Sequence, residues 1–426
     1  METNDKRVLM SIQNVDIEFS KKKSIFSKVQ PIRVIRDLSL DIHEGEIVAV
    51  VGESGCGKTT IGKAICGLYK PARGKILFNG KDIWSMSGGD FDAYRNGVQM
   101  VQQDSYAALN PVRNIYETLS GPILEKKIVR NNHEARQRVA ELLHTVELNP
   151  PELFFEKYPH QLSGGQRQRI LMARAISLSP KLIVADEPVS MIDVSLRISI
   201  LNLMSRLNRE LGIAFVYITH DLATARYIAQ SGKICVMYLG KLVEYGDILP
   251  VIRNPMHPYL QVLISAVPVP DPIVEKGKKR LPLRSIDMPS VVNPPPGCPF
   301  HPRCIFADEL CQREDKPLEQ VADGRFVACH HYLDLEERAK AYRGGRQRMS
   351  ERKPEDKRGA RRAFSVDDIE RTTFAISLAV VVIGLFCLPN VEKGGSTWHV
   401  LMLVFGINAV LILWILCRIF RRRRKG

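Results

Sequence analysis

A chain of 426 residues is long enough for roughly two to four structural units. Lysine and arginine outnumber aspartate and glutamate by 61 to 46, which gives a formal net charge of +15. Six basic residues and no acidic residue lie between Arg418 and Lys425. Much of the basicity therefore belongs to a terminal tail rather than to a nucleic-acid-binding face, and we expect no nucleic-acid partner.

The N-terminal sequence METNDKRVLM lacks the long apolar core of a signal peptide, which predicts that the first domain stays in the cytoplasm. In that reducing compartment the nine cysteines are expected to be thiols or metal ligands rather than disulfides. Residues 1–268 alternate apolar, strand-like runs with longer amphipathic segments, which predicts an α/β domain.

An apolar strand at residues 48–51 runs into a glycine-rich loop that ends in lysine and threonine. The stretch Gly52–Thr59 fits G-x-x-x-x-G-K-[ST], in which backbone N–H groups and the following helix N-terminus form a cradle for polyphosphate. Lys58 is expected to reach the β- and γ-phosphates, and the Thr59 hydroxyl to bind Mg²⁺. The alternative is a plain glycine turn, which the strand–loop–helix context disfavours.

A second glycine-containing loop, LSGGQRQR, occupies Leu162–Arg169. Its two glycines precede a helix-forming run, with Ser163 as the expected N-cap, so this loop is a second candidate for binding an anion. One nucleotide can use both loops of one subunit only if they are adjacent. We therefore expect a head-to-tail pair of domains with nucleotide between them.

The stretch LIVADEP at Leu182–Pro188 predicts a buried strand that ends in two carboxylates. A carboxylate at the C-terminal end of a parallel strand lies at the crevice where nucleotides bind. We expect Asp186 to hold the Mg²⁺ shell and Glu187 to orient and polarise the attacking water. An ordinary helix cap after a strand is the alternative for this motif alone.

Together these motifs resemble those of the ABC-transporter ATPases over residues 8–268. Within that resemblance the remaining motifs are the Q-loop Gln103, the signature Leu162–Gln166, the D-loop around Asp193 and the switch His220. The resemblance implies a P-loop, RecA-like α/β core with an antiparallel β subdomain and a helical subdomain at about residues 112–178.

The resemblance also implies roles in phosphoryl transfer from ATP to water. Glu187 is expected to be the general base, His220 to contact the γ-phosphate and the water, and Gln103 to join Thr59 and Asp186 around Mg²⁺. Phe19 is the candidate for stacking on adenine, with a core position as the alternative. The other expected nucleotide-binding residues are Gly52, Glu53, Ser54, Gly55, Cys56, Gly57, Lys58, Thr59 and Thr60, then Ser163, Gly164, Gly165, Gln166 and Asp193. Ser163 and Gly165 would act on the site of the facing subunit.

Longer segments resemble the oligopeptide/dipeptide permease ATPases, namely VQMVQQDSYAALNPVRNI, YPHQLSGGQRQRI, DEPVSMIDVS, NPMHPYLQVLISAVPVPDP and NPPPGCPFHPRC. The insertion SKKKSIFSKVQPIRVI and the stretch AVPVPDP favour the F-type subunit. The resemblance implies an ATP-hydrolysing importer subunit on the cytoplasmic side of the cell membrane. Its expected partners are a D-type ATPase subunit, two permease subunits and, indirectly, an extracytoplasmic solute-binding protein. The alternatives are nickel, glutathione or oligosaccharide as cargo, and a non-transport ABC ATPase, which the single cassette disfavours.

A proline-rich extension at residues 269–332 carries four cysteines, Cys298, Cys304, Cys311 and Cys329. Their C-x5-C-x6-C-x17-C spacing matches neither zinc ribbons nor ferredoxins, so spacing leaves a [4Fe–4S] cluster, Zn²⁺ and unligated thiols open. Some peptide-permease ATPases with this C-terminal pattern carry a [4Fe–4S] cluster. The resemblance therefore favours the cluster, with Zn²⁺ as the second candidate. The three nearby histidines, His301, His330 and His331, are expected to be ordinary loop residues.

The chain continues beyond the usual length of such ATPases. Residues 333–371 carry charges of both signs and read as a linker. The runs Phe374–Pro389 and Trp398–Cys417 contain no charged residue, and about 20 such residues span a bilayer. We expect a transmembrane hairpin at residues 372–417 and a basic cytoplasmic tail at 418–426 that obeys the positive-inside rule. A buried helical pair in a globular domain is the alternative.

Overall fold

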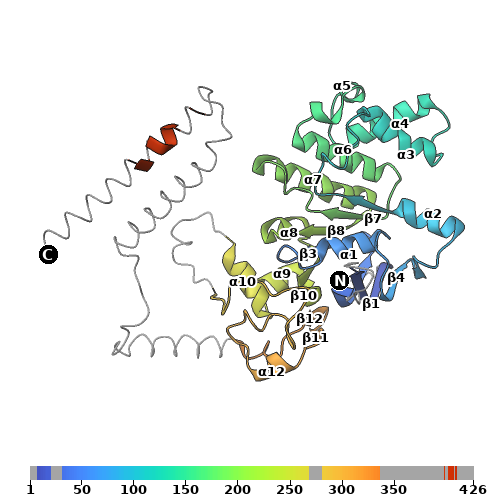
Figure 1. Ribbon diagram of the computed structural model, residues 1–426. Coiled ribbons are helices and arrows are strands. Elements are labelled where there is room, and N and C mark those ends of the chain that lie inside the picture. The colour runs from blue at the N-terminus through green and yellow to red at the C-terminus, as the bar shows by residue number, and fades with distance from the viewer. Residues whose placement is uncertain are drawn as a thin grey trace, which may run out of the picture. The chain divides into compact units, whose positions relative to one another are not determined.

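The computed structural model describes residues 7–20, 31–267 and 281–335, and helical residues at 398, 402–406 and 408–409. The chain divides into two compact units, Met1–Gly345 and Arg346–Gly426. In the second unit the Asn408 side-chain amide donates a hydrogen bond to the Val404 carbonyl at 2.9 Å, within the helical residues. The elements below belong to the first unit (Figure 1).

A mixed eight-stranded sheet, in the order β11-β12-β10-β9-β3-β8-β7-β6, forms the centre of the first unit. Its parallel strands are β3 (Ile47–Val51), β6 (Val98–Val101), β7 (Leu182–Asp186), β8 (Ala214–Thr219) and β9 (Lys233–Tyr238). Every residue of β3, β7 and β8 is buried, because helices or strands cover both faces. This burial explains why these strands read as unbroken apolar runs.

The two faces of the central sheet belong to two hydrophobic cores. Successive side chains of a strand point to opposite faces, so Ala49 and Val51 enter one core and Val48 and Val50 the other. The helix α1 (Lys58–Ile65) packs in the second core, against β7 and β8. The helix α8 (Leu222–Ile228) packs in the first, against β3 and β8.

A second, antiparallel sheet lies on the α1 side and has the order β2-β1-β4-β5. Its strands are β1 (Val8–Ser20), β2 (Pro31–His43), β4 (Arg73–Phe78) and β5 (Lys81–Asp82), followed by α2 (Gly88–Gly97). The alternating burial of β2 is typical of a strand with one face in the core and one in solvent.

Helices fill the chain between β6 and β7. They are α3 (Ile115–Glu125), α4 (Asn132–Thr145), α5 (Glu152–Phe155), the 3₁₀ turn η1 (Pro159–Gln161) and α6 (Gly164–Ile176). Figure 1 shows α3 to α6 gathered at one end of the unit, with α7 (Val194–Leu211) between them and the central sheet. These helices fall within residues 112–178, where the sequence predicts a helical subdomain. An α/β P-loop core is therefore present as predicted.

The cysteine-bearing extension continues the central sheet. After β10 (Lys241–Asp247), α9 (Ile248–Arg253) and α10 (Pro258–Ala266), the described chain resumes and forms α12 (Glu309–Arg313), β11 (Glu319–Ala322) and β12 (Arg325–Val327). Strand β12 pairs antiparallel with β10, at Glu244↔Val327 and Tyr245↔Phe326. The extension therefore shares its hydrogen-bonded framework with the ATPase core.

A buried ion pair reinforces this junction. The Arg325 guanidinium donates to the Glu244 carboxylate at 2.7 Å, and the Glu244 side chain has no exposed surface. The backbone N–H groups of Met256 and His257 donate to the same carboxylate at 3.0 and 2.8 Å. Burial raises the pKa of Glu244, and these hydrogen bonds and Arg325 oppose that rise. Glu244 thus depends on its partners to remain ionised.

No helix among the described residues is long and apolar enough to cross a membrane. Apart from the helical residues given above for the second unit, the predicted hairpin at 372–417 lies outside the described residues. The same holds for most of the linker at 333–371 and for the tail at 418–426.

Substituting Arg325→Ala should destabilise the first unit by about 3–5 kcal/mol, because it leaves the Glu244 carboxylate buried without its cation. Urea unfolding of the full chain measures this loss. The matched control is Arg313→Ala, whose ion pair with Glu309 is largely exposed and should matter little. Equal stability of the two variants would contradict a structural role for the Arg325 pair.

Candidate functional site

The glycine-rich loop lies between β3 and α1 and needs its glycines for two reasons. Gly55 and Gly57 have φ values of 80° and 106°, in the left-handed region that favours glycine. A Cβ on Gly52 would lie 2.3 Å from the Met237 carbonyl oxygen of β9. Any side chain at Gly52 would therefore push the loop off the sheet.

Lys58 begins α1 and is only 6% exposed. Its ammonium group donates to the Gly52 carbonyl at 2.8 Å and to the Glu53 carbonyl at 3.0 Å. These bonds satisfy a charge that would otherwise be costly to bury. They also hold the ammonium group across the loop, where it can exchange these carbonyl acceptors for the oxygens of a phosphate.

Thr59 and Asp186, both predicted to bind Mg²⁺, lie together at the carboxyl end of the sheet. The Thr59 hydroxyl donates to an Asp186 carboxylate oxygen at 3.1 Å. Burial raises the pKa of Asp186; the Thr59 hydrogen bond opposes the rise and the neighbouring Glu187 carboxylate adds to it. Oxygen ligands of this kind, in a site where a carboxylate lacks full charge compensation, suit a hard divalent cation.

The Glu187 carboxylate is held on both sides by residues that the sequence predicted to act with it. The Gln103 side-chain amide donates to one oxygen at 3.0 Å, and Nδ1 of His220 lies 3.0 Å from the other. Glu187 itself has φ 44°, a left-handed conformation that costs a non-glycine residue roughly 1–3 kcal/mol. Its backbone N–H donates to the Ile218 carbonyl of β8 at 2.9 Å, which holds that conformation.

A cavity lies beside this carboxylate. Its volume is about 440 Å³, and it is lined by Glu187, Ser190, Arg197, Thr219, His220 and Asp221, among others, but by no residue of the Gly52–Thr59 loop. His220 is exposed at this cavity, Gln103 is exposed outside its lining, and Asp186 is buried. The site is thus open on the side of the Glu187 carboxylate.

The signature residues are built as a helix N-terminus. Ser163 caps α6: its hydroxyl accepts from the Gln166 N–H at 3.3 Å, and the Gln166 side chain accepts from the Ser163 N–H at 3.0 Å. The D-loop and the helix after it are close, since a Cβ on Gly164 would lie 3.8 Å from the Met191 carbonyl oxygen and one on Gly165 would lie 3.3 Å from Leu196 of α7. Among the described residues, no hydrogen bond joins these loops to the phosphate-binding loop of the same chain.

The D-loop presents apolar side chains to solvent next to the signature. Met191 is 62% exposed and Val194, at the start of α7, is 73% exposed. Asp193 lies between them, at the N-cap of α7, and is also exposed.

The remaining predicted nucleotide-binding residues lie in or near the loop. Ser54 is exposed, Thr60 is half-buried, and the Cys56 side chain is buried, with the Cys56 carbonyl accepting from Gly240 N–H at 2.9 Å. Phe19, near the end of β1, is 37% exposed and contacts Tyr69 edge-on at 5.0 Å between ring centroids. This ring therefore keeps one side in solvent.

The four cysteines of the extension surround one small cavity of about 20 Å³, enough for a water-sized species. The Cys298 N–H donates to the Cys311 carbonyl at 2.9 Å, which brings two of the cysteine turns together. Burial raises the pKa of Cys304 and of Cys329 to about 12 and that of Cys311 to about 11. Without a cation these thiols are protonated. Cysteine thiolates are ligands that soft metals prefer, but no three of these four sulfurs lie within 4.8 Å of one another.

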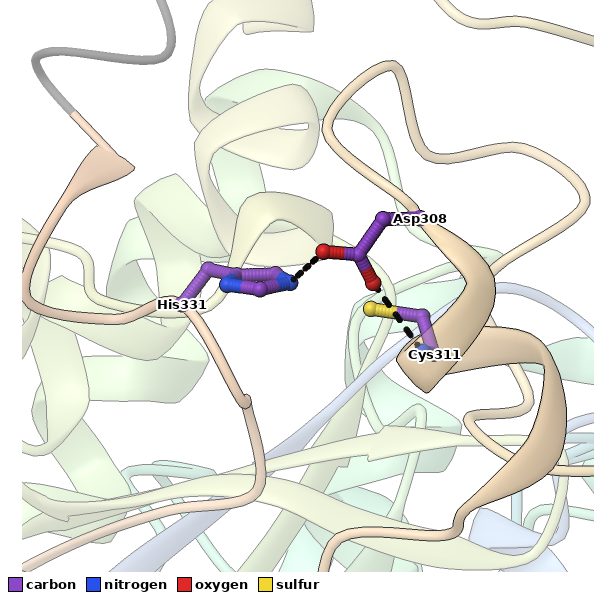
Figure 2. Close-up of side chains that lie close together, drawn as sticks. All are labelled: Asp308, Cys311 and His331. Carbon is purple, nitrogen blue, oxygen red and sulfur yellow. Dashed lines mark hydrogen bonds and ion pairs between the residues drawn. The ribbon is translucent and has the colours of Figure 1, made fainter.

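Figure 2 shows a group at this cavity that sequence reasoning missed. Ligand atoms of Asp308, Cys311 and His331 all lie within 4.8 Å of one another. Nε2 of His331 is 2.9 Å from an Asp308 carboxylate oxygen, and the Cys311 N–H donates to the other oxygen at 3.2 Å. Burial would raise the pKa of Asp308, but the Cys311 and His331 hydrogen bonds lower it to about 2. Asp308 shows the spacing of an N-cap for α12, yet nothing in the sequence marks His331 as its partner.

Comparison with known proteins agrees with this geometry. Residues 35–190 match the family model "ABC transporter", and residues 243–311 match "Oligopeptide/dipeptide transporter, C-terminal region". The chain is 41% identical over 327 residues to the putative oligopeptide transport ATP-binding protein YkfD of Bacillus subtilis, covering 76% of this chain and 98% of that protein. The chain belongs to the oligopeptide/dipeptide family of ABC transporter ATP-binding proteins.

A second member of the family, the oligopeptide transport ATP-binding protein OppF of Haemophilus influenzae, is 39% identical over 330 residues. That match covers 77% of this chain and 98% of OppF. Among solved structures, the chain is similar to the ATP-binding cassette MJ0796, whose dimeric, post-hydrolysis structure contains ADP and Pi. The two are 29% identical with a TM-score of 0.49, and the match covers 56% of this chain and 99% of MJ0796. The two relatives, YkfD and OppF, confirm at the level of the family the resemblance that the motifs indicate.

Proposed function

We propose that this chain binds ATP with Mg²⁺ at the Gly52–Thr59 loop and hydrolyses it to drive peptide uptake, as the ATP-binding subunit of an ABC importer. The observation that carries the proposal is the Glu187 carboxylate, held between Gln103 and His220 and adjacent in sequence to the Thr59–Asp186 pair. The names of the relatives supply the cargo class, oligopeptides. Nickel, glutathione and oligosaccharide remain alternative cargoes.

In this proposal each side chain has one task. Lys58 exchanges its two carbonyl acceptors for the β- and γ-phosphates, and Thr59, Asp186 and Gln103 organise Mg²⁺. Glu187 accepts the proton of the attacking water, and His220 contacts that water and the γ-phosphate. The chemistry is positioning and charge neutralisation by groups that the fold already places around the site.

We further propose that the signature acts on the ATP site of a second ATPase subunit. Ser163, Gly164, Gly165, Gln166 and Asp193 would face the γ-phosphate bound by the partner, a D-type subunit in the F-type arrangement. Two observations support this pairing: the signature lies beside the D-loop of its own chain, and the D-loop carries exposed apolar side chains. A partner surface would remove Met191 and Val194 from water.

We propose a [4Fe–4S] cluster at Cys298, Cys304, Cys311 and Cys329, with Zn²⁺ as the second candidate. Support comes from the chemistry of thiolate ligands and from the four cysteines that line one cavity. Because that cavity has a volume of only about 20 Å³, its lining would have to move apart to hold four irons. Bound iron would hold the four sulfurs as thiolates, whose pKa values are otherwise raised by burial. The Asp308–His331 pair would then be the nearest polar neighbour of Cys311.

We propose the following domain plan: an ATPase domain at 1–268, the extension at 269–332, the linker at 333–371, the membrane hairpin at 372–417 and the tail at 418–426. The two uncharged runs support the hairpin, because each supplies close to the length of a bilayer crossing. Such a hairpin would anchor the ATPase beside two permease subunits and leave the C-terminus in the cytoplasm. The extracytoplasmic solute-binding protein would act on the far side of the membrane.

Substituting Glu187→Gln should preserve ATP affinity and lower turnover by a factor on the order of 100 or more, because an amide cannot accept the proton. Lys58→Ala should weaken ATP binding itself. ATP titration and steady-state hydrolysis with the assembled transporter measure both effects. Turnover at the unmodified rate in Glu187→Gln would remove this carboxylate from the mechanism.

Protein purified without oxygen should contain about four irons per chain and absorb broadly at about 400 nm. Cys304→Ser should lose the iron and the colour, whereas Cys66→Ala, a buried cysteine outside the cavity, should keep both. One zinc per chain and no iron would establish the second candidate. If neither the unmodified protein nor Cys66→Ala contained iron or zinc, a metal centre would be rejected.

The hairpin should keep the chain in the membrane without its permease. Full-length chain expressed alone should resist extraction with high-pH carbonate, and truncation after Tyr332 should release it. Release of the full-length chain would contradict membrane insertion, whichever cargo the transporter carries.

A further inference from the structure

A residue of the cysteine-bearing extension reaches the phosphate-binding loop. The Arg303 guanidinium donates to both oxygens of the Glu53 carboxylate, at 2.6 and 2.9 Å. This two-pronged geometry is the strongest that arginine and a carboxylate form. The two residues are 250 positions apart in the chain, so the contact exists only in the folded molecule.

The arginine is enclosed. Arg303 is 5% exposed, and its guanidinium lies 5.9 and 5.8 Å from the ring centroids of Tyr238 and Phe300. Both rings are buried, and with Tyr259 they form one aromatic cluster with centroids 4.7 to 5.4 Å apart. Burial would lower the pKa of Arg303, but Glu53 and Tyr238 raise it, so the side chain keeps its charge. The Arg303 guanidinium therefore has little room to change its position.

The same glutamate is held through its main chain. The Glu53 N–H donates to the Tyr259 hydroxyl at 2.8 Å. Its carbonyl accepts from the Lys58 ammonium at 3.0 Å and from the Cys56 N–H at 3.3 Å. Whatever places Glu53 therefore places one of the two acceptors that hold Lys58.

Arg303 also belongs to the first cysteine turn. The N–H groups of Arg303 and Cys304 both donate to the Phe300 carbonyl at 3.0 Å, and the His301 N–H donates to the Cys298 carbonyl at 3.0 Å. The turn from Cys298 to Cys304 thus carries the arginine between two of the predicted metal ligands. Its side chain points to the nucleotide loop while its neighbour Cys304 lines the cysteine cavity.

We propose that Arg303 is a positioning residue for ATP binding: through Glu53 it sets the conformation of the phosphate-binding loop and of Lys58. The extension thereby acts as a brace for the nucleotide site in addition to carrying the cysteines. This inference rests on the proposed binding of ATP at that loop. According to this inference, the extension contributes to ATP affinity through a residue that lies outside the ATPase motifs.

The test is a double-mutant cycle on the full chain in its assembled transporter, with ATP titration and steady-state kinetics as readouts. Arg303→Gln and Glu53→Gln should each raise the dissociation constant and KM for ATP about tenfold, which corresponds to about 1.4 kcal/mol. In Arg303→Gln the turnover number at saturating ATP should stay within about twofold, because Arg303 does not touch the reacting atoms. Arg303→Lys should recover only part of the affinity, since an ammonium group lacks the planar two-pronged geometry.

The double variant should be no weaker than the worse single variant, because both lose one interaction. Arg313→Gln is the control, an exposed arginine of the same extension whose pair with Glu309 lies away from the loop. Tyr259→Phe, which removes the acceptor of the Glu53 N–H, should also raise KM and gives a second test if Arg303→Gln does not fold.

Unchanged ATP affinity in Arg303→Gln, or in Tyr259→Phe where that variant must be used, would overturn the inference, as would additive losses in the double variant. Failure of the proposed function looks different: ATP affinity would then survive Lys58→Ala. If Lys58→Ala abolishes binding and Arg303→Gln leaves it intact, the brace alone is wrong.

Discussion

The parallel pairing of β3 with β8 and of β8 with β7 is the constraint on which the rest of the structure depends. In a parallel sheet all carboxyl ends meet at one edge, so the loop after β3, the carboxylates that end β7 and the histidine after β8 come together there. These residues span positions 52 to 220, and no local interaction could gather them. The price of this arrangement is complete burial of the strands, which is why Ile, Val, Ala and Phe fill them.

Sequence reasoning reached the parts of the site that follow this rule. Asp186, Glu187 and His220 lie at or just beyond a strand end, and Thr59 lies in the first turn of the helix after β3. Each belongs to a motif whose spacing is set by local geometry. Gln103 and His220, which the sequence placed at Mg²⁺ and at the γ-phosphate, are hydrogen-bonding partners of Glu187 in the structure. A motif is visible in a sequence when its chemistry and its backbone shape are encoded within a few residues.

Other features had no such local code. The Arg303–Glu53 contact joins positions 250 residues apart, and the Arg325–Glu244 pair depends on an antiparallel register between β10 and the very short β12. Strands of three or four residues are too short to show a recognisable hydrophobic periodicity in the sequence. The Asp308–His331 pair is similar, because a loop histidine acquires its partner only through tertiary folding.

The extension consequently cannot be treated as an appendage. It adds two strands to the central sheet, supplies the cation for a buried glutamate and supplies the arginine that holds Glu53. Two of its cysteines, Cys298 and Cys304, belong to the same turn as that arginine. Stability of the core, geometry of the nucleotide loop and the thiol cavity are therefore linked through a few tens of residues.

The exposed side chains of the D-loop have a consequence for the cell if the proposed pairing with a second ATPase subunit holds. Met191 and Val194 present apolar surface next to the signature, and an unpaired copy leaves that surface in water. Copies made in excess of the proposed partner would then carry a surface prone to self-association or to capture by chaperones. In that pairing, balanced synthesis of the two ATPase subunits, as from one messenger, would keep this surface covered from the start.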